Sequence, residues 1–154
     1  MTITHSQPPV WVTYYYNEYA LILSGEMDSV WAYMLYENNI ISDCLLVTTL
    51  RPTQADTHDI AFYKQHDAPP PLTSEYASPI AYIAAPNNAM FRVLWSPEGH
   101  EALIALDDQV HAYLNIHEPY GYSKALLEDG PYGQSWREFP LAHINQTSTH
   151  TEYD

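Results

Sequence analysis

The sequence predicts a mainly β fold: an antiparallel sheet or meander, arranged as a sandwich or a strongly curled sheet, with one or two short helices. Three observations predict this class. Hydrophobic and polar residues alternate at period two in several segments, turn-forming clusters separate those segments, and no segment shows a long amphipathic helical pattern. With 154 residues, the chain is long enough for one domain that buries a core without metal ions or disulfide bonds.

Eight segments are expected to form strands. The clearest is VHAYLNI at residues 110–116, which alternates between an inward and an outward face. The expected inward residues are Val110, Ala112, Leu114 and Ile116, and the expected outward residues are His111, Tyr113 and Asn115. The other segments are rich in the β-branched and aromatic residues that pack well on a pleated surface. They span residues 10–16, 19–24, 30–36, 43–50, 80–85, 90–96 and 102–106.

The connections between these segments carry residues that favour tight reversals. Clusters of Asn, Asp, Pro and Gly occur at 37–39, 86–88, 96–99 and 107–108. Short connections of this kind join antiparallel strands, so the region 80–116 is predicted to be a meander.

Two fragments have helical features, DIAFYKQ at 59–65 and SKALLEDG at 123–130. In the second fragment, Ser123 can cap the helix at its start and Gly130 can end it. Pro131 then prevents the helix from continuing.

The expected organisation is one β-rich domain over residues 1–144. Within it, residues 51–79 form a long proline-containing connection, and a connection of this length is either functional or packed as an ordered excursion. The run Pro69–Pro71 is expected to be an extended polyproline II spacer. Residues 145–154, NQTSTHTEYD, are polar and are expected to be a flexible tail.

The charge of the chain disfavours several classes of partner. With 19 acidic and 5 basic residues the formal net charge is −14, and it is spread over both halves of the chain. A surface of this sign repels nucleic-acid phosphate and anionic lipid, which proteins bind mainly through Lys and Arg. The same field accelerates encounter with a basic protein, although an acidic charge also serves solubility alone. We expect no nucleic acid and no membrane among the partners.

Targeting and membrane signals are missing from the sequence. The N-terminal residues lack a basic segment followed by an apolar one, and no apolar run reaches membrane-spanning length. A single cysteine, Cys44, cannot form an intramolecular disulfide, which agrees with a reducing compartment. The expected location is therefore the cytoplasm.

Motifs for catalysis or metal binding are also missing. No spacing among the 8 histidines matches a zinc site, and there is no glycine-rich phosphate loop or nucleophile elbow. Cys44 lies in the apolar segment DCLLV, where a thiol is ordinarily part of the core. The acidic pairs Glu128–Asp129 and Asp107–Asp108 are neighbours in turns, not carboxylates that face each other across a substrate. We expect no enzymatic activity, no cofactor and no metal.

Tyrosine dominates the aromatic residues of this chain, with 14 Tyr beside 4 Trp and 3 Phe. The tripeptide Pro-Tyr-Gly occurs twice, at 119–121 and 131–133, on either side of an acidic segment. Tyrosine suits binding faces because its ring can be buried while its hydroxyl stays hydrogen-bonded, and Pro and Gly reduce the entropy that a loop loses on docking. The predicted protein-binding residues are Tyr120, Tyr122, Tyr132 and Trp136 as anchors, and Glu118, Glu128, Asp129, Asp107 and Asp108 as charge partners.

A small, acidic, tyrosine-rich β domain of this kind resembles the immunity proteins that bacteria encode beside polymorphic toxins. The resemblance rests on the overall character together with the segments PPPLTSEYASP at 69–79 and PYGYSKALLEDGPYGQSW at 119–136. It implies an inhibitor that occludes the active site of a cationic toxin domain, such as a nuclease or an ADP-ribosyltransferase. Three alternatives remain open at this point: a carbohydrate or small-ligand binding β module, an enzyme, and a structural or assembly subunit of a phage or secretion system.

Overall fold

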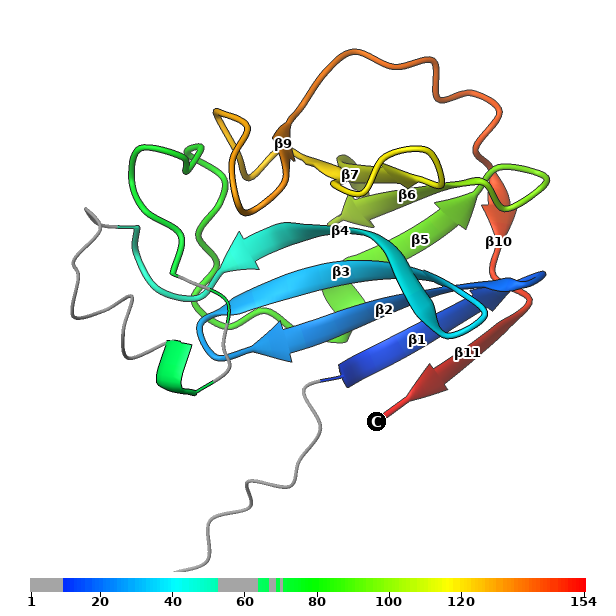
Figure 1. The fold of residues 1–154 in the computed structure, drawn as a ribbon, viewed down its shortest axis with the longest axis horizontal. Helices are drawn as coiled ribbons and strands as arrows, with labels where there is room; N and C mark the ends of the chain where they lie inside the picture. Colours follow the sequence, from blue (N-terminus) through cyan, green and yellow to red (C-terminus); the bar gives the residue numbers. More distant parts are fainter. Residues whose placement is uncertain (1–9, 53–63, 67–68, 70) are drawn as a thin grey trace, which may run out of the picture.

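The computed structural model describes residues 10–52, 64–66, 69 and 71–154. Two β-sheets form its two layers (Figure 1). The first sheet has five strands in the order β11-β1-β2-β3-β4, and the second has six in the order β10-β5-β6-β7-β8-β9. The predicted mainly β class is confirmed.

The first sheet is a meander of hairpins with one added edge strand. Its strands are β1 Val10–Tyr16, β2 Tyr19–Glu26, β3 Ser29–Tyr36, β4 Asn39–Thr48 and β11 His150–Tyr153. Two-residue turns join β1 to β2 and β3 to β4, and they place Asn17, Glu37 and Asn38 at φ values of 53°, 49° and 67°. Positive φ in two-residue turns matches the right-handed twist of the paired strands, so these turns hold the antiparallel register.

The second sheet begins after the short 3₁₀ helix η1 Asn88–Met90. Its strands are β5 Phe91–Trp95, β6 Glu101–Leu106, β7 Gln109–Asn115, β8 Tyr122–Ser123, β9 Gln134–Ser135 and β10 Gln146–Thr147. All pairs are antiparallel except β8 with β9, which is parallel.

The C-terminal segment differs from its predicted state as a flexible tail. Residues 145–154 contain β10, which pairs with β5, and β11, which pairs with β1 over Val12–Tyr15. These are short edge strands with mostly exposed side chains, so their sequence carries no hydrophobic alternation. Backbone hydrogen bonds hold them in place, and the segment links the two sheets.

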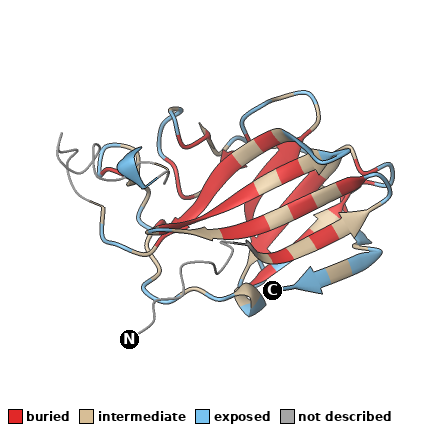
Figure 2. Ribbon diagram, turned by 60° about the horizontal axis from the view of Figure 1, so that its bottom comes forward, coloured by how far each residue is buried: buried red, intermediate tan, exposed pale blue. Residues whose placement is uncertain are grey.

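The main core lies between the two sheets and uses one face of each. Along several strands, segments coloured as buried alternate with segments coloured as intermediate (Figure 2). This core is made of residues from both layers, among them Leu21, Leu23, Met34, Leu46, Val93, Trp95, Ile104 and Leu114.

The outer faces of both sheets are also partly covered, which corrects the predicted outward face of residues 110–116. His111, Tyr113 and Asn115 are all buried. Tyr113 packs against Tyr122 and Phe139 in an outer cluster. Because distant segments return over the sheet, period-two alternation cannot separate core from solvent there.

A β-bulge explains why the alternation also fails at the start of β7. The register runs from Ala112 opposite Ile104 directly to Val110 opposite Ala105, which leaves His111 as the extra residue. Ala112 and Leu114 face the main core as predicted, whereas Val110 packs in the outer cluster.

Two predicted elements are absent from the described structure. Residues 80–85 form no strand and contribute only a bridge between Tyr82 and Thr48. Residues 123–130 are not helical, because Ser123 pairs with β7 and Leu126 is drawn into a cluster beside Trp31. The helix predicted at 59–65 lies outside the described residues except for Lys64 and Gln65, which are helical.

The long connection 51–79 can be followed only in part. Residues 53–63, 67, 68 and 70 lie outside the described residues. The polyproline II prediction for 69–71 is therefore not tested, because the middle residue of the run is among them. Beyond them, Leu72 is buried in the cluster beside Trp31.

Candidate functional site

The segment that follows β7 and runs to two residues past β9, residues 116–137, folds along the free edge of β4. Gly121 donates its N–H to the Asp43 carbonyl at 2.7 Å, and Leu45 donates to the Tyr132 carbonyl at 2.9 Å. The two Pro-Tyr-Gly units therefore close the edge of the first sheet with backbone hydrogen bonds. An exposed edge is a template for unwanted pairing, and this segment covers it.

The glycines of both units pack against the same residue, Cys44. A Cβ at Gly121 would lie 2.7 Å from Leu114 Cγ and 3.0 Å from Cys44 Sγ. At Gly133, where φ is +128°, a Cβ would lie 2.9 Å from both Cys44 Cβ and the Gly121 carbonyl oxygen. Glycine is required here because the backbone passes too close to β4 for any side chain. Cys44 is fully buried, and burial raises the pKa of its thiol, so it acts as core.

The tyrosines of the two units have different environments. Tyr120 is 52% exposed, whereas Tyr132 is only 4% exposed. The Tyr132 hydroxyl donates to the Pro71 carbonyl at 2.8 Å, and its ring meets Tyr76 edge to face at 5.3 Å. The two Pro-Tyr-Gly units thus share a backbone role but differ in their tyrosines. The Tyr120 ring faces solvent, whereas the Tyr132 ring is buried and anchors the connection at Pro71.

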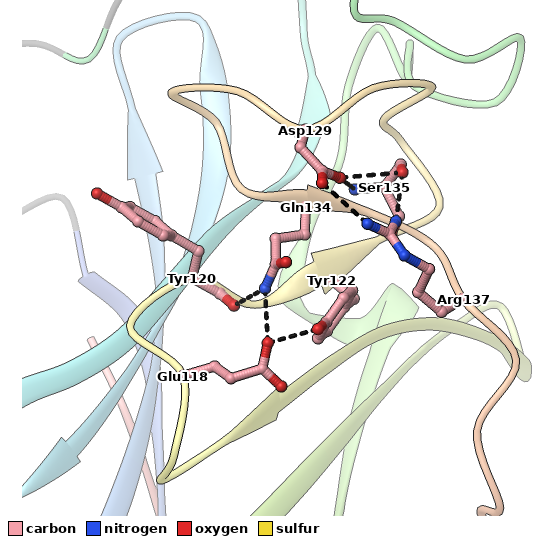
Figure 3. A network of polar contacts seen from close by, with 7 residues as sticks. All are labelled: Glu118, Tyr120, Tyr122, Asp129, Gln134, Ser135 and Arg137. Carbon is pink, nitrogen blue, oxygen red and sulfur yellow. Dashed lines mark hydrogen bonds and ion pairs between the residues drawn. The ribbon is translucent and has the colours of Figure 1, made fainter.

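Glu118 lies at the centre of a polar network (Figure 3). Its carboxylate accepts hydrogen bonds from the Tyr122 hydroxyl and from Gln134 Nε2, the latter at 2.9 Å. Gln134 Nε2 also donates to the Tyr120 carbonyl at 2.8 Å. Partial burial by itself raises the pKa of Glu118, but these hydrogen bonds and a third from Asn115 outweigh it and hold the pKa below its ordinary value. The Glu118 carboxylate therefore holds Tyr122 and Gln134, at the start of β8 and of β9, close to the turn at residues 116–121.

Asp129 is the centre of a second group of polar contacts, on the other side of β9 from Glu118. It pairs with Arg137 at 2.8 Å and accepts hydrogen bonds from the Ser135 N–H at 2.9 Å and hydroxyl at 3.1 Å (Figure 3). The hydrogen bond from Arg137 is the main reason that the pKa of Asp129 is lowered. Both groups of the pair are about half exposed, so its Coulomb energy is small and its geometric role is larger.

An open pocket of about 430 Å³ lies beside this segment. Its lining residues are Ser78, Pro79, Ile80, Lys124, Leu126, Leu127, Ser135 and Trp136. Ile80 and Leu127 are 53% and 58% exposed, so both present apolar surface to solvent beside the pocket. Lys124 Nζ lies 5.1 Å from the centre of the Trp136 ring, a cation–π geometry. The pocket therefore has an apolar rim and an aromatic wall.

The structure separates the predicted binding residues into three groups. Tyr122 and Tyr132 are buried and serve the fold, which corrects their prediction as anchors for a partner. Glu118 and Asp129 belong to internal networks. The exposed residues of the predicted set on this segment are Tyr120, Glu128 and Asp129, and Trp136 is half-buried.

Asp107 and Asp108, two of the predicted charge partners, form the turn between β6 and β7. Its residues have φ values of 49° and 64°, and their described contacts are to other elements. Asp107 N–H donates to the Met90 carbonyl at 2.8 Å, and Asp108 lies 3.8 Å from Arg92. The turn thus belongs to the β5 side of the second sheet.

Sequence reasoning missed Ile80 and Leu127 as surface residues. Ile80 begins the predicted strand at 80–85 and Leu127 lies in the predicted helical fragment at 123–130, and neither pattern marks the residue as exposed. An apolar residue directly next to an acidic pair, as in Leu127-Glu128-Asp129, was the available signal for exposure.

Two absences can be stated of the described part of the chain. There, no three His, Cys, Asp or Glu side chains come together as a possible metal site, and no helix is long and apolar enough to cross a membrane. His111 Nε2 donates to the Leu46 carbonyl at 2.6 Å, and burial lowers the pKa of this imidazole.

Comparison with known proteins finds no matching family model, no matching curated protein and no matching solved structure.

Proposed function

We propose that this chain is an acidic protein-binding inhibitor of the immunity-protein type, which neutralises a basic toxin domain by covering its active site. The observation that supports it is an exposed, largely apolar pocket on a chain of net charge −14. Lys124 is the charged residue of its lining, and the exposed acid Glu128 follows the lining residue Leu127. Exposed apolar patches with polar rims are typical of protein interaction sites.

In this proposal the pocket receives an apolar side chain of the partner. Ile80 and Leu127 form its rim and Trp136 its wall, and burial of these groups would supply most of the binding energy. Glu128 follows Leu127 directly, is exposed, and forms no ion pair within the described residues. A Lys or Arg of the partner would pair with Glu128 at the edge of the pocket.

The networks around Glu118 and Asp129 support this surface indirectly. They fix the loop before the partner arrives, so less conformational entropy is lost on binding. The class of target follows from charge. Nucleases and ADP-ribosyltransferases act on phosphate-bearing substrates, so their active sites present the basic surface that an acidic inhibitor complements.

The test begins with a search for a toxin domain encoded by a neighbouring gene. That domain is then studied with this chain by growth rescue and by binding kinetics at low and high salt. Leu127→Ala should speed dissociation and weaken affinity about tenfold, because it empties the rim of the pocket. Glu128→Lys should slow association and reduce its dependence on salt.

Glu18→Lys is the control for charge, since Glu18 is an exposed acid in the β1–β2 turn. It should change association less than Glu128→Lys does. Binding that is insensitive to both Leu127→Ala and Glu128→Lys would move the interface elsewhere, and absence of binding to the neighbouring toxin domain would refute the function.

A further inference from the structure

A second pocket, of about 320 Å³, lies where β1 begins. Its lining residues are Trp11, Pro86, Asn87, Asn88 and Asp154. They come from three segments: the start of β1, the residues around η1, and the end of the chain after β11. Figure 2 shows η1 beside the C-terminus, and the Asp154 N–H donates to the Trp11 carbonyl at 3.1 Å. None of these residues lines the pocket beside Trp136.

The indole of Trp11 is held in place by packing. A Cβ at Gly25 would lie 2.4 Å from Trp11 Nε1 and 2.8 Å from Cε2, so the ring lies directly against the β2 backbone. On another side it contacts Phe91, with ring centres 6.5 Å apart and planes tilted by 51°. A half-buried aromatic ring fixed in this way is a rigid wall for a ligand.

The polar groups of the pocket are also held in place. Asn87 Oδ1 accepts the Ala89 N–H at 2.9 Å, which orients the amide and leaves the two hydrogens of its Nδ2 as donors. The backbone around it is tied by bonds from Met90 N–H to the Asn87 carbonyl and from Phe91 N–H to the Asn88 carbonyl. The Asn88 amide adds a donor and an acceptor, and the Asp154 carboxylate adds acceptors.

We propose that this pocket binds a neutral carbohydrate, with one sugar ring against the indole of Trp11. The C–H face of a pyranose is apolar and suits the electron-rich face of an indole. Its hydroxyls both donate and accept, which matches two amides and a carboxylate.

Charge and size narrow the ligand further. No basic side chain lines the pocket, Asp154 does line it, and the chain carries −14, so an anionic ligand is repelled. The volume lies at the small end of the range for small-molecule sites, about 300–1,000 Å³, and suits one or two sugar rings. The site is separate from the proposed protein-binding surface and does not depend on it.

The test is a titration of the whole chain, labelled with ¹⁵N, with four disaccharides: cellobiose, lactose, mannobiose and N,N′-diacetylchitobiose. At least one should shift the Trp11 Nε1–H and the Asn87 and Asn88 side-chain amide signals, with an affinity of about millimolar strength. Asn88→Ala should weaken that binding about two- to tenfold by removing one hydrogen-bonding group. Trp11→Ala should weaken disaccharide binding at least about tenfold. If Trp11→Ala does not fold, the result with Asn88→Ala decides the test.

Trp136→Ala is the matched control, because it removes the aromatic wall of the other pocket and should leave sugar binding unchanged. Choline is the second control, since an indole beside a carboxylate could also hold an organic cation. Three results would overturn the proposal: no shift with any disaccharide up to about 20 mM, shifts centred on Trp136, or saturable binding of choline in place of sugar.

Discussion

Replacing Gly133 by alanine tests whether the second Pro-Tyr-Gly unit requires glycine for its backbone conformation and its close approach to β4. At φ +128° an L-residue is strained, which costs on the order of 1–3 kcal/mol. The new Cβ would also lie 2.9 Å from Cys44 Cβ and from the Gly121 carbonyl oxygen, neither of which can rotate away. Together these effects predict a loss of about 3 kcal/mol in the free energy of unfolding, or roughly 6–12 °C in Tm for a chain of this size.

The assay is urea and thermal unfolding of Gly133→Ala and Gly121→Ala, each with and without Cys44→Ala. The contacts of a Cβ at Gly121 are side-chain atoms, including Cys44 Sγ at 3.0 Å, so removing that sulfur should recover part of the lost stability. Cys44→Ala should not rescue Gly133→Ala, because the Cβ contact, the carbonyl contact and the φ strain all remain. A Gly133→Ala variant as stable as the parent would refute the reasoning.

Two further predictions concern buried polar groups. Burial lowers the pKa of His111 in the folded chain, so the unfolded chain binds more protons below about pH 6.5. The free energy of unfolding should therefore fall as the pH is lowered through this range. His111→Gln should flatten this pH dependence, measured by urea unfolding between pH 4 and 8. Tyr132→Phe removes the hydrogen bond to the Pro71 carbonyl and should cost about 1 kcal/mol, whereas Tyr120→Phe, at an exposed ring, should stay within about 0.5 kcal/mol of the parent. Equal effects of the two Tyr→Phe changes would contradict the different roles assigned to the two repeats.

The strands that could be predicted are those with a local signal. β1 to β4 and β5 to β7 contain β-branched and aromatic residues bounded by turn residues, and their positions follow from period-two alternation. The strands β8 to β11 could not be predicted this way. They are two to four residues long and form because distant backbone reaches a sheet edge, which leaves no periodic pattern.

The structure can be compared with the predicted binding segment in the exposure of its residues, whereas binding of a partner there stays a prediction. The acidic, tyrosine-rich segment does lie at the surface of the fold beside a pocket. Which of its residues reach solvent depended on packing from elsewhere, since Tyr132 is buried by the connection at residues 71–76 and Tyr122 by Phe139. Ile80 reached the site from another part of the chain, so no local pattern could include it.

By itself, the sequence determined the β class, the approximate positions of β1 to β7, and the strong negative charge. These depend on side-chain periodicity, turn conformation and composition, which are local or additive properties. Only the tertiary structure decided that the two glycines of the repeat pack on Cys44, that one repeat tyrosine is buried and the other exposed, and that Trp11 meets Asn87, Asn88 and Asp154 in one pocket. Each of these depends on contacts between segments far apart in the chain, which form only when the two sheets stack.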